Sequence, residues 1–269
     1  MRSVRLFIRM HGKLFMTVLP ALLENYFRFC SVRSRFRTEK SIDISDGSLS
    51  PMILLPLGDF LKKNAQKCSL PKAGCLDFFV SGAKGGFDKD CRILELPAGK
   101  GNAEGLMEAF FEACGNGLAF GGENAFKYVT NEIVTNIYEH SGFTHAYLMA
   151  QEQPGFVDLC FYDDGVSIPG SFKRRGMNFS SDVEAIAEAV NGLSTKGGTE
   201  RGYGLGTALN LSKSGLKAEC AVVSASGALS LSTATQAFHL PHGYAMDGTL
   251  IGARIPLSRT AVDIYGYLQ

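Results

Sequence analysis

Three polar residues recur at every fourth position in one stretch of the chain. They are Glu132, Asn136 and His140, and a helix would place them on one face. An Asn amide oxygen is a neutral ligand suited to a Mg²⁺ ion that meets nucleotide phosphates. A Glu carboxylate one turn earlier could take a proton from an attacking water. On its own, the stripe is more typical of the polar outer face of an ordinary amphipathic helix.

A second group of residues leaves an expected strand and enters a glycine loop. An ionised Asp163 could accept a hydrogen bond from the exocyclic amine of adenine, and Gly165 allows the backbone to approach the base closely. Ser167 follows two residues later. A D-G turn that ends a strand has the same appearance, so this group alone does not decide between a turn and a base-binding loop.

A third group is a glycine-rich segment directly before an expected helix. It contains two basic residues, three alternating glycines and a threonine: Lys196, Arg201, Gly202, Gly204, Gly206 and Thr207. Glycines let backbone N–H groups surround phosphate oxygens, and a helix start adds further donors. The segment lacks the preceding strand of a dinucleotide fingerprint and the G-K-[ST] of a P-loop. A flexible linker is the alternative.

In their order and spacing, the three groups resemble the motifs of the GHKL, or Bergerat-fold, ATPases. Residues 131–141 resemble the N-box (E-x-x-x-N-x-x-x-H) and residues 163–168 resemble the G1 box. Residues 194–207 resemble the end of the lid together with the G2 box. The resemblance covers about residues 90–257. Two positions depart from the family pattern: Ser167 replaces the second glycine of D-x-G-x-G, and Thr207-Ala208 replaces a bulkier aliphatic helix start.

The resemblance implies a role for each residue and implies ATP and Mg²⁺ as cofactors. Glu132 would be the base or water-orienting carboxylate, Asn136 the metal ligand, and Asp163 the contact to adenine. The remaining nucleotide-binding positions would be Gly165, Ser167, Lys196, Arg201, Gly202, Gly204, Gly206 and Thr207.

The elements that must position these groups follow from hydrophobic periodicity and turn signals. Helices are expected at residues 57–65, 102–114, 123–139, 182–191 and 207–214, and strands at 76–80, 91–96, 146–151, 156–162, 219–224, 228–232 and 249–256. This alternation predicts an α/β (α+β) two-layer sandwich. A mixed, mostly antiparallel sheet would be covered on one face by helices, with a small N-terminal appendage.

Charge is spread unevenly along the 269 residues, whose net charge is +1. Residues 1–40 hold nine Lys or Arg against two Glu, a balance of +7. We expect a basic N-terminal arm (1–40), an appendage of unknown role (41–89) and a histidine-kinase-like ATPase domain (90–260). The arm is either solvated or an amphipathic surface for a partner. A chain that begins near Met52 is expected to keep its fold and its nucleotide binding.

The composition predicts a cytoplasmic protein. Hydrophobic residues are 45% and charged residues 20%, and no apolar run approaches the roughly 18 residues of a membrane-spanning helix. The apolar run at 14–23 does not indicate a secretory signal, because no cleavage site follows it and Glu24 interrupts it. Seven scattered cysteines without a C-x-x-C pair indicate reduced thiols.

The function expected from the resemblance is a cytosolic, Mg-dependent ATP-binding regulatory protein, with a serine/threonine protein kinase of the anti-sigma-factor type as its activity. The alternative is an ATP-gated protein-binding module with little or no catalysis. A sensor histidine kinase is not expected, because His11 lacks the acidic neighbour and the long helical hairpin of a phosphoacceptor. A protein partner would bind through the N-terminal region or the lid, and a homodimer is compatible with the sequence. A nucleic-acid ligand is the most distant option.

Overall fold

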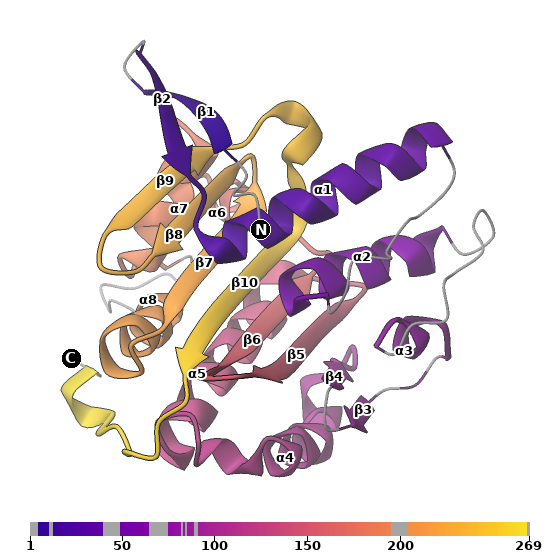
Figure 1. Cartoon of the computed structure of the whole chain (residues 1–269), viewed down its shortest axis with the longest axis vertical. Helices are drawn as coiled ribbons and strands as arrows, with labels where there is room; N and C mark the ends of the chain where they lie inside the picture. Colours follow the sequence, from indigo (N-terminus) through magenta and orange to yellow (C-terminus); the bar gives the residue numbers. More distant parts are fainter. Residues whose placement is uncertain are drawn as a thin grey trace.

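A computed structural model describes residues 5–10, 13–39, 49–64, 75–81, 83, 85–88, 91–194 and 204–267. Its centre is an eight-stranded antiparallel sheet in the order β3-β4-β5-β6-β10-β7-β8-β9 (Figure 1). These strands are β3 (Gly85–Asp88), β4 (Cys91–Glu95), β5 (Ala146–Gln153), β6 (Phe156–Asp163), β7 (Glu219–Ala225), β8 (Gly227–Leu231), β9 (Thr235–His239) and β10 (Met246–Pro256). A separate hairpin pairs β1 (Arg5–Met10) with β2 (Lys13–Val18).

Some helices come before the sheet in the sequence, and others lie in the connections between its strands. They are α1 (Ala21–Glu39), α2 (Pro51–Lys63), α3 (Leu76–Ser81), α4 (Glu104–Ala113), α5 (Glu123–Asn136), α6 (Ile168–Arg174), α7 (Asp182–Val190) and α8 (Leu205–Asn210). One π-helical turn, η4 (Ile137–Ser141), continues α5, and another, η5 (Leu211–Gly215), continues α8. The predicted α+β class with a mostly antiparallel sheet is confirmed.

The central strands are apolar on both sides, and each side has its own core. Along β6, Leu159 and Phe161 belong to the core shared with α4, α5, α7 and α8. Cys160 and Tyr162 point the other way, into a second core shared with α1, α2 and α3. Successive strand residues face opposite sides of a sheet, so burial of every residue from 157 to 163 requires a cover on each face.

Two N-terminal helices supply much of the cover on the second face, in addition to the helical layer expected on the first. Leu23 and Tyr26 of α1 and Met52 and Leu55 of α2 are fully buried. Figure 1 shows α1 and α2 lying across this face. Residues 21–39, which were expected to belong to a basic arm, therefore form a helix packed on the sheet.

The end of α1 is tied to the loop before β10. Arg33 is almost completely buried, and its guanidinium donates to the carbonyl oxygens of Gly243 (2.9 Å) and Ala245 (3.1 Å). The hydroxyl of Tyr26 donates to the carbonyl oxygen of Tyr244 at 2.6 Å. One of the basic residues counted toward the arm thus binds backbone carbonyl groups of this loop.

Short elements differ most from the sequence predictions. Residues 76–80 form helix α3 and not a strand, because a short apolar run fits either element and here Phe78 and Phe79 pack into the second core. Strand β3, at Gly85–Asp88, was not among the predicted strands. Strand β9 was not predicted, since only Phe238 of its five residues is buried and no alternation marks it.

Helix α2 begins earlier than predicted. Ser50 caps it by accepting a hydrogen bond from the N–H of Met52, and Pro51 occupies its first turn, where a missing N–H is harmless. Pro56 lies inside the helix, although a proline normally occurs at the start of a helix or breaks it. The prediction of a start at Leu57 was therefore wrong.

No helix among the described residues is long and apolar enough to cross a membrane. Cys30, Cys114, Cys160 and Cys220 are buried free thiols. Cys75 takes part in a disulfide, which corrects the expectation that every cysteine is reduced.

Candidate functional site

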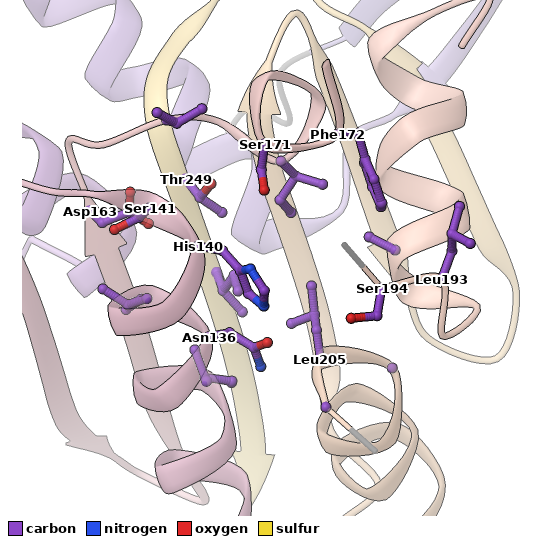
Figure 2. A pocket seen from close by; sticks show the side chains of 18 of the residues that line it. Asn136, His140, Ser141, Asp163, Ser171, Phe172, Leu193, Ser194, Leu205 and Thr249 are labelled. Atoms are coloured by element: carbon purple, nitrogen blue, oxygen red, sulfur yellow. The ribbon is translucent and has the colours of Figure 1, made fainter. Parts of the chain in front are cut away.

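A pocket opens on the first face of the sheet, between α5 with its π-helical turn and the facing ends of α6, α7 and α8 (Figure 2). Its empty space is about 850 Å³, a figure that includes open solvent at the mouth. The polar residues that line it are Asn136, His140, Ser141, Asp163, Ser171, Ser194 and Thr249. The larger apolar ones are Ile133, Ile137, Val166, Ile168, Phe172, Leu193, Leu205 and Ile251.

Asp163, at the end of β6, is the buried acid of the pocket. Its side chain lies at one end of the pocket beside Ser141 (Figure 2). The N–H of Gly165 donates to its Oδ1 at 3.0 Å. Burial raises the pKa of the Asp163 carboxyl to about 7, against the lowering effect of that hydrogen bond. The pocket thus holds a carboxyl group that changes charge near neutral pH.

Ser224 of β7 joins three parts of the pocket floor. Its Oγ donates to the carbonyl oxygen of Gly248 (3.0 Å) and lies 3.0 Å from Oγ1 of Thr249. The same Oγ accepts from the N–H of Ile168 at 2.9 Å. Thr249 is also the strand partner of Asp163, so this network holds the start of α6 and the start of β10 beside the buried acid.

The loop after Asp163 packs tightly against the end of η4. The N–H of Val166 donates to the carbonyl oxygen of Ser141 at 2.6 Å. A Cβ atom at Gly165 would lie 2.3 Å from that same oxygen, so this position has no room for a side chain. Ser167 does not line the pocket but caps α6, with its Oγ accepting from the N–H of Gly170 at 3.2 Å.

We expect Gly165→Ala to destabilise the protein by about 1–3 kcal/mol, because the added methyl group must displace the loop or η4. Gly105→Ala is the matched control: a Cβ at Gly105 would meet nothing within 4 Å, and alanine is at least as favourable as glycine in a helix. Urea denaturation of both variants measures the difference. Equal midpoints would contradict the tight packing at Gly165.

The polar stripe of α5 reaches the pocket in part. Figure 2 shows Asn136 and His140 projecting from α5 and η4 along one wall. The amide nitrogen of Asn136 donates to the carbonyl oxygen of Glu132 at 2.7 Å, which leaves the amide oxygen for a ligand. Glu132 itself is half-buried one turn earlier and is not among the residues that line the pocket.

The glycine-rich segment meets the pocket where it rejoins the described residues. Gly204 and Gly206 line the pocket, whereas Thr207 follows in α8 outside the lining. A Cβ at Gly206 would lie 2.5 Å from the carbonyl oxygen of Val190, so glycine permits the close packing of α8 on α7. Lys196, Arg201 and Gly202 lie outside the described residues, and their assignment stays a prediction.

Asp164, the neighbour of Asp163, points away from the pocket to the second face. Its Oδ1 accepts from the N–H groups of Thr144 and His145, each at 2.8 Å, and its Oδ2 binds Nζ of Lys63 at 2.7 Å. Burial pushes the pKa of Asp164 upward, but the hydrogen bonds from Lys63 and the two amides outweigh it and leave the pKa below its usual range.

Asp59, His145 and Asp164 bring their ligand atoms within 4.8 Å of one another, as a metal site would. A cation already lies among them, because Nζ of Lys63 is 2.8 Å from Oδ2 of Asp59 and 2.7 Å from Oδ2 of Asp164. Charge in this cluster is therefore compensated by lysine, and we interpret the cluster as an ion-pair network.

No known protein family, curated protein or solved structure matches the chain. Of the residues predicted from sequence, Asn136, Asp163, Gly204 and Gly206 line one pocket. Ser141 and Thr249 were not predicted. Thr249 could have been found from the sequence, since it begins the predicted closing strand, whereas nothing in the local pattern distinguishes Ser141.

Proposed function

We propose that the chain binds ATP with Mg²⁺ in this pocket, as its resemblance to the GHKL ATPases implies. One observation carries the proposal: three sequence groups far apart in the chain supply the walls of one pocket. Asn136 comes from the first group, Asp163 from the second and Gly204 from the third. Such convergence supports a common ligand.

The described residues fit a purine base. Asp163 offers a buried carboxylate to the exocyclic amine of adenine. Apolar surface for the base comes from Ile133, Ile251 and Phe172. A few polar groups on a mostly apolar wall are typical of ligand pockets. For the triphosphate, the described residues provide the Asn136 amide oxygen as one Mg²⁺ ligand. When bound, the ion would neutralise phosphate charge.

The activity of a serine/threonine kinase of the anti-sigma-factor type belongs to this proposal, with Glu132 as its base. The second candidate, an ATP-gated protein-binding module, is favoured by the place of Glu132 outside the pocket lining. Both candidates require Mg·ATP to bind. Calorimetry with the full chain tests this shared step, and absence of saturable Mg·ATP binding would overturn both.

We expect Asn136→Ala to lose most of the Mg²⁺-dependent part of ATP affinity, because the ion would lose its protein ligand. The measurement is ATP binding by calorimetry with excess Mg²⁺ and again with EDTA. With EDTA, wild type and variant should bind alike. If Asn136→Ala binds Mg·ATP as tightly as wild type, Asn136 is not the metal ligand.

Glu132→Ala separates the two candidates. A base contributes little to ground-state affinity, so the variant should bind ATP nearly as wild type does. Any turnover or phosphate transfer should fall about 10²- to 10⁴-fold. The measurement is release or transfer of γ-labelled phosphate. An active wild type whose turnover survives Glu132→Ala would exclude Glu132 as the base, and an inactive wild type would favour the binding module.

A further inference from the structure

Asp163 and Asp164 are consecutive, and they connect the pocket with the opposite layer of the molecule. Asp163 ends β6 and faces the pocket. Asp164 turns to the second face, where its side chain binds Lys63 of α2 and the amides of Thr144 and His145. A displacement of the Asp164 backbone shifts the peptide plane that it shares with Asp163, and so can move the Asp163 backbone as well.

Helix α2 holds this end of β6 at two points. Lys63 reaches Asp164 at 2.7 Å and also reaches Asp59, on its own helix, at 2.8 Å. The hydroxyl of Tyr162, the residue before Asp163, donates to Oδ2 of Asp59 at 2.8 Å. Asp59 and Tyr162 are both buried. The residues on either side of Asp163 are therefore fastened to one helix.

The charges of Lys63, Asp59 and Asp164 also favour a defined position of these side chains. The pKa of Lys63 lies above its usual range: burial would lower it, but hydrogen bonds to Asp164 and Asp59 outweigh that effect. A fully charged ammonium between two buried carboxylates is a charge-assisted contact, which is shorter and stronger than a neutral hydrogen bond. Lys63 keeps part of its side chain in solvent, so its removal leaves an open space and not a closed cavity.

We propose that Lys63 is a positioning residue for ATP binding, which holds the Asp163 carboxyl in its binding orientation through Asp164. The inference rests on the proposed binding of ATP in the pocket. Under this proposal, α2 contributes to the nucleotide site, although it belongs to the region expected to be an appendage. Loss of the contact removes one anchor of Asp164, leaves those from Thr144 and His145, and lets the end of β6 sample orientations in which Asp163 does not meet the base.

The neighbouring lysine provides a matched control. Lys62 lies on the same helix and pairs with another buried carboxylate, Glu95, at 2.9 Å. Glu95 belongs to β4 and does not line the pocket. Lys62→Met removes one lysine–carboxylate contact of α2 and Lys63→Met removes two, but only Lys63→Met acts on the residue beside Asp163.

Calorimetry of Mg·ATP binding to the full chain tests the proposal. We expect Lys63→Met to weaken binding about 3- to 10-fold, in the range by which residues outside a site modulate it. Lys62→Met should leave affinity unchanged, and Lys63→Arg should restore most of the lost affinity. Melting temperatures of the variants show how much of each effect is general destabilisation.

A double-mutant cycle tests the route through Asp163. In an Asp163→Asn background, Lys63→Met should have little further effect on affinity, because the group it positions has been replaced. An equal loss in both backgrounds would overturn this route. If wild type binds ATP and Lys63→Met behaves as Lys62→Met does, the positioning role alone is overturned. If wild type binds no ATP, the proposed function fails and this inference fails with it.

Discussion

Asp163→Asn should weaken ATP binding about 10- to 100-fold, because a charge-assisted hydrogen bond to the adenine amine contributes roughly 1.5–3 kcal/mol. An amide can present its NH₂ group to the base and cannot offer a charged acceptor. Calorimetry at pH 8, above the raised pKa of Asp163, measures the loss. Asp77→Asn, on an exposed position of α3, is the control and should bind as wild type does. Unchanged affinity in a folded Asp163→Asn protein would remove Asp163 from the site.

The same substitution should stabilise the ligand-free protein at high pH. The Asp163 pKa is about 7 in the fold, against an ordinary value of 3.8, so the folded state favours the protonated carboxyl. The contribution of the protonated carboxyl to the stability of the fold is fully present below about pH 4 and is lost as pH rises through 7. At pH 8 the loss is on the order of 4 kcal/mol. Urea denaturation of wild type and Asp163→Asn between pH 4 and 8 should show the gap widening with pH, and a constant gap would contradict the raised pKa.

A chain that begins at Leu49 should fail to fold cooperatively, whereas one that begins at Leu19 should fold. The shorter chain lacks α1, whose large buried residues are Leu22, Leu23, Tyr26, Phe27, Phe29 and Phe36. Burying one such side chain stabilises a fold by about 1.5–3 kcal/mol, and whole domains have a net stability of only about 5–15 kcal/mol. This expectation reverses the earlier one, that a chain beginning near Met52 keeps its fold because the resemblance to the GHKL ATPases begins only near residue 90.

Near-ultraviolet circular dichroism and thermal melting of the two truncated chains make this comparison. The Leu19 chain keeps α1 and its anchor at Arg33, so it controls for the loss of the N-terminal hairpin. We expect the Leu49 chain to lose its near-ultraviolet signal and its sharp transition. A cooperative transition at the same temperature in both chains would show that α1 is dispensable.

The elements around the pocket could be predicted because their signals are local. The helical period of residues 123–139 and the strand pattern of 156–162 depend on neighbours within a few positions. The same holds for Asn136 and Asp163, whose types and spacing are visible in the sequence. Their convergence needed a fold-level resemblance, since no local rule brings residues 136 and 204 together.

The second helical layer was missed because the basic residues of α1 dominated its interpretation. Its apolar residues, such as Leu22 and Tyr26, cover a sheet face that the sequence also indicates, since residues 159–162 are apolar and alternate between the two faces of the sheet. A strand buried on both faces needs two covers. The opposite directions of Asp163 and Asp164 follow from the strand alternation in the same way, which would have excluded Asp164 from the pocket.

The position of β10 constrains the order in which this protein can acquire its structure during synthesis. This strand lies between β6 and β7, yet it is the last of the sheet to leave the ribosome. Until residue 256 has emerged, β6 and β7 each present an apolar strand with an open edge, the kind of edge that recruits other chains. The nascent protein therefore carries its greatest risk of aggregation late in synthesis, and the pocket is completed only when Thr249 arrives beside Asp163.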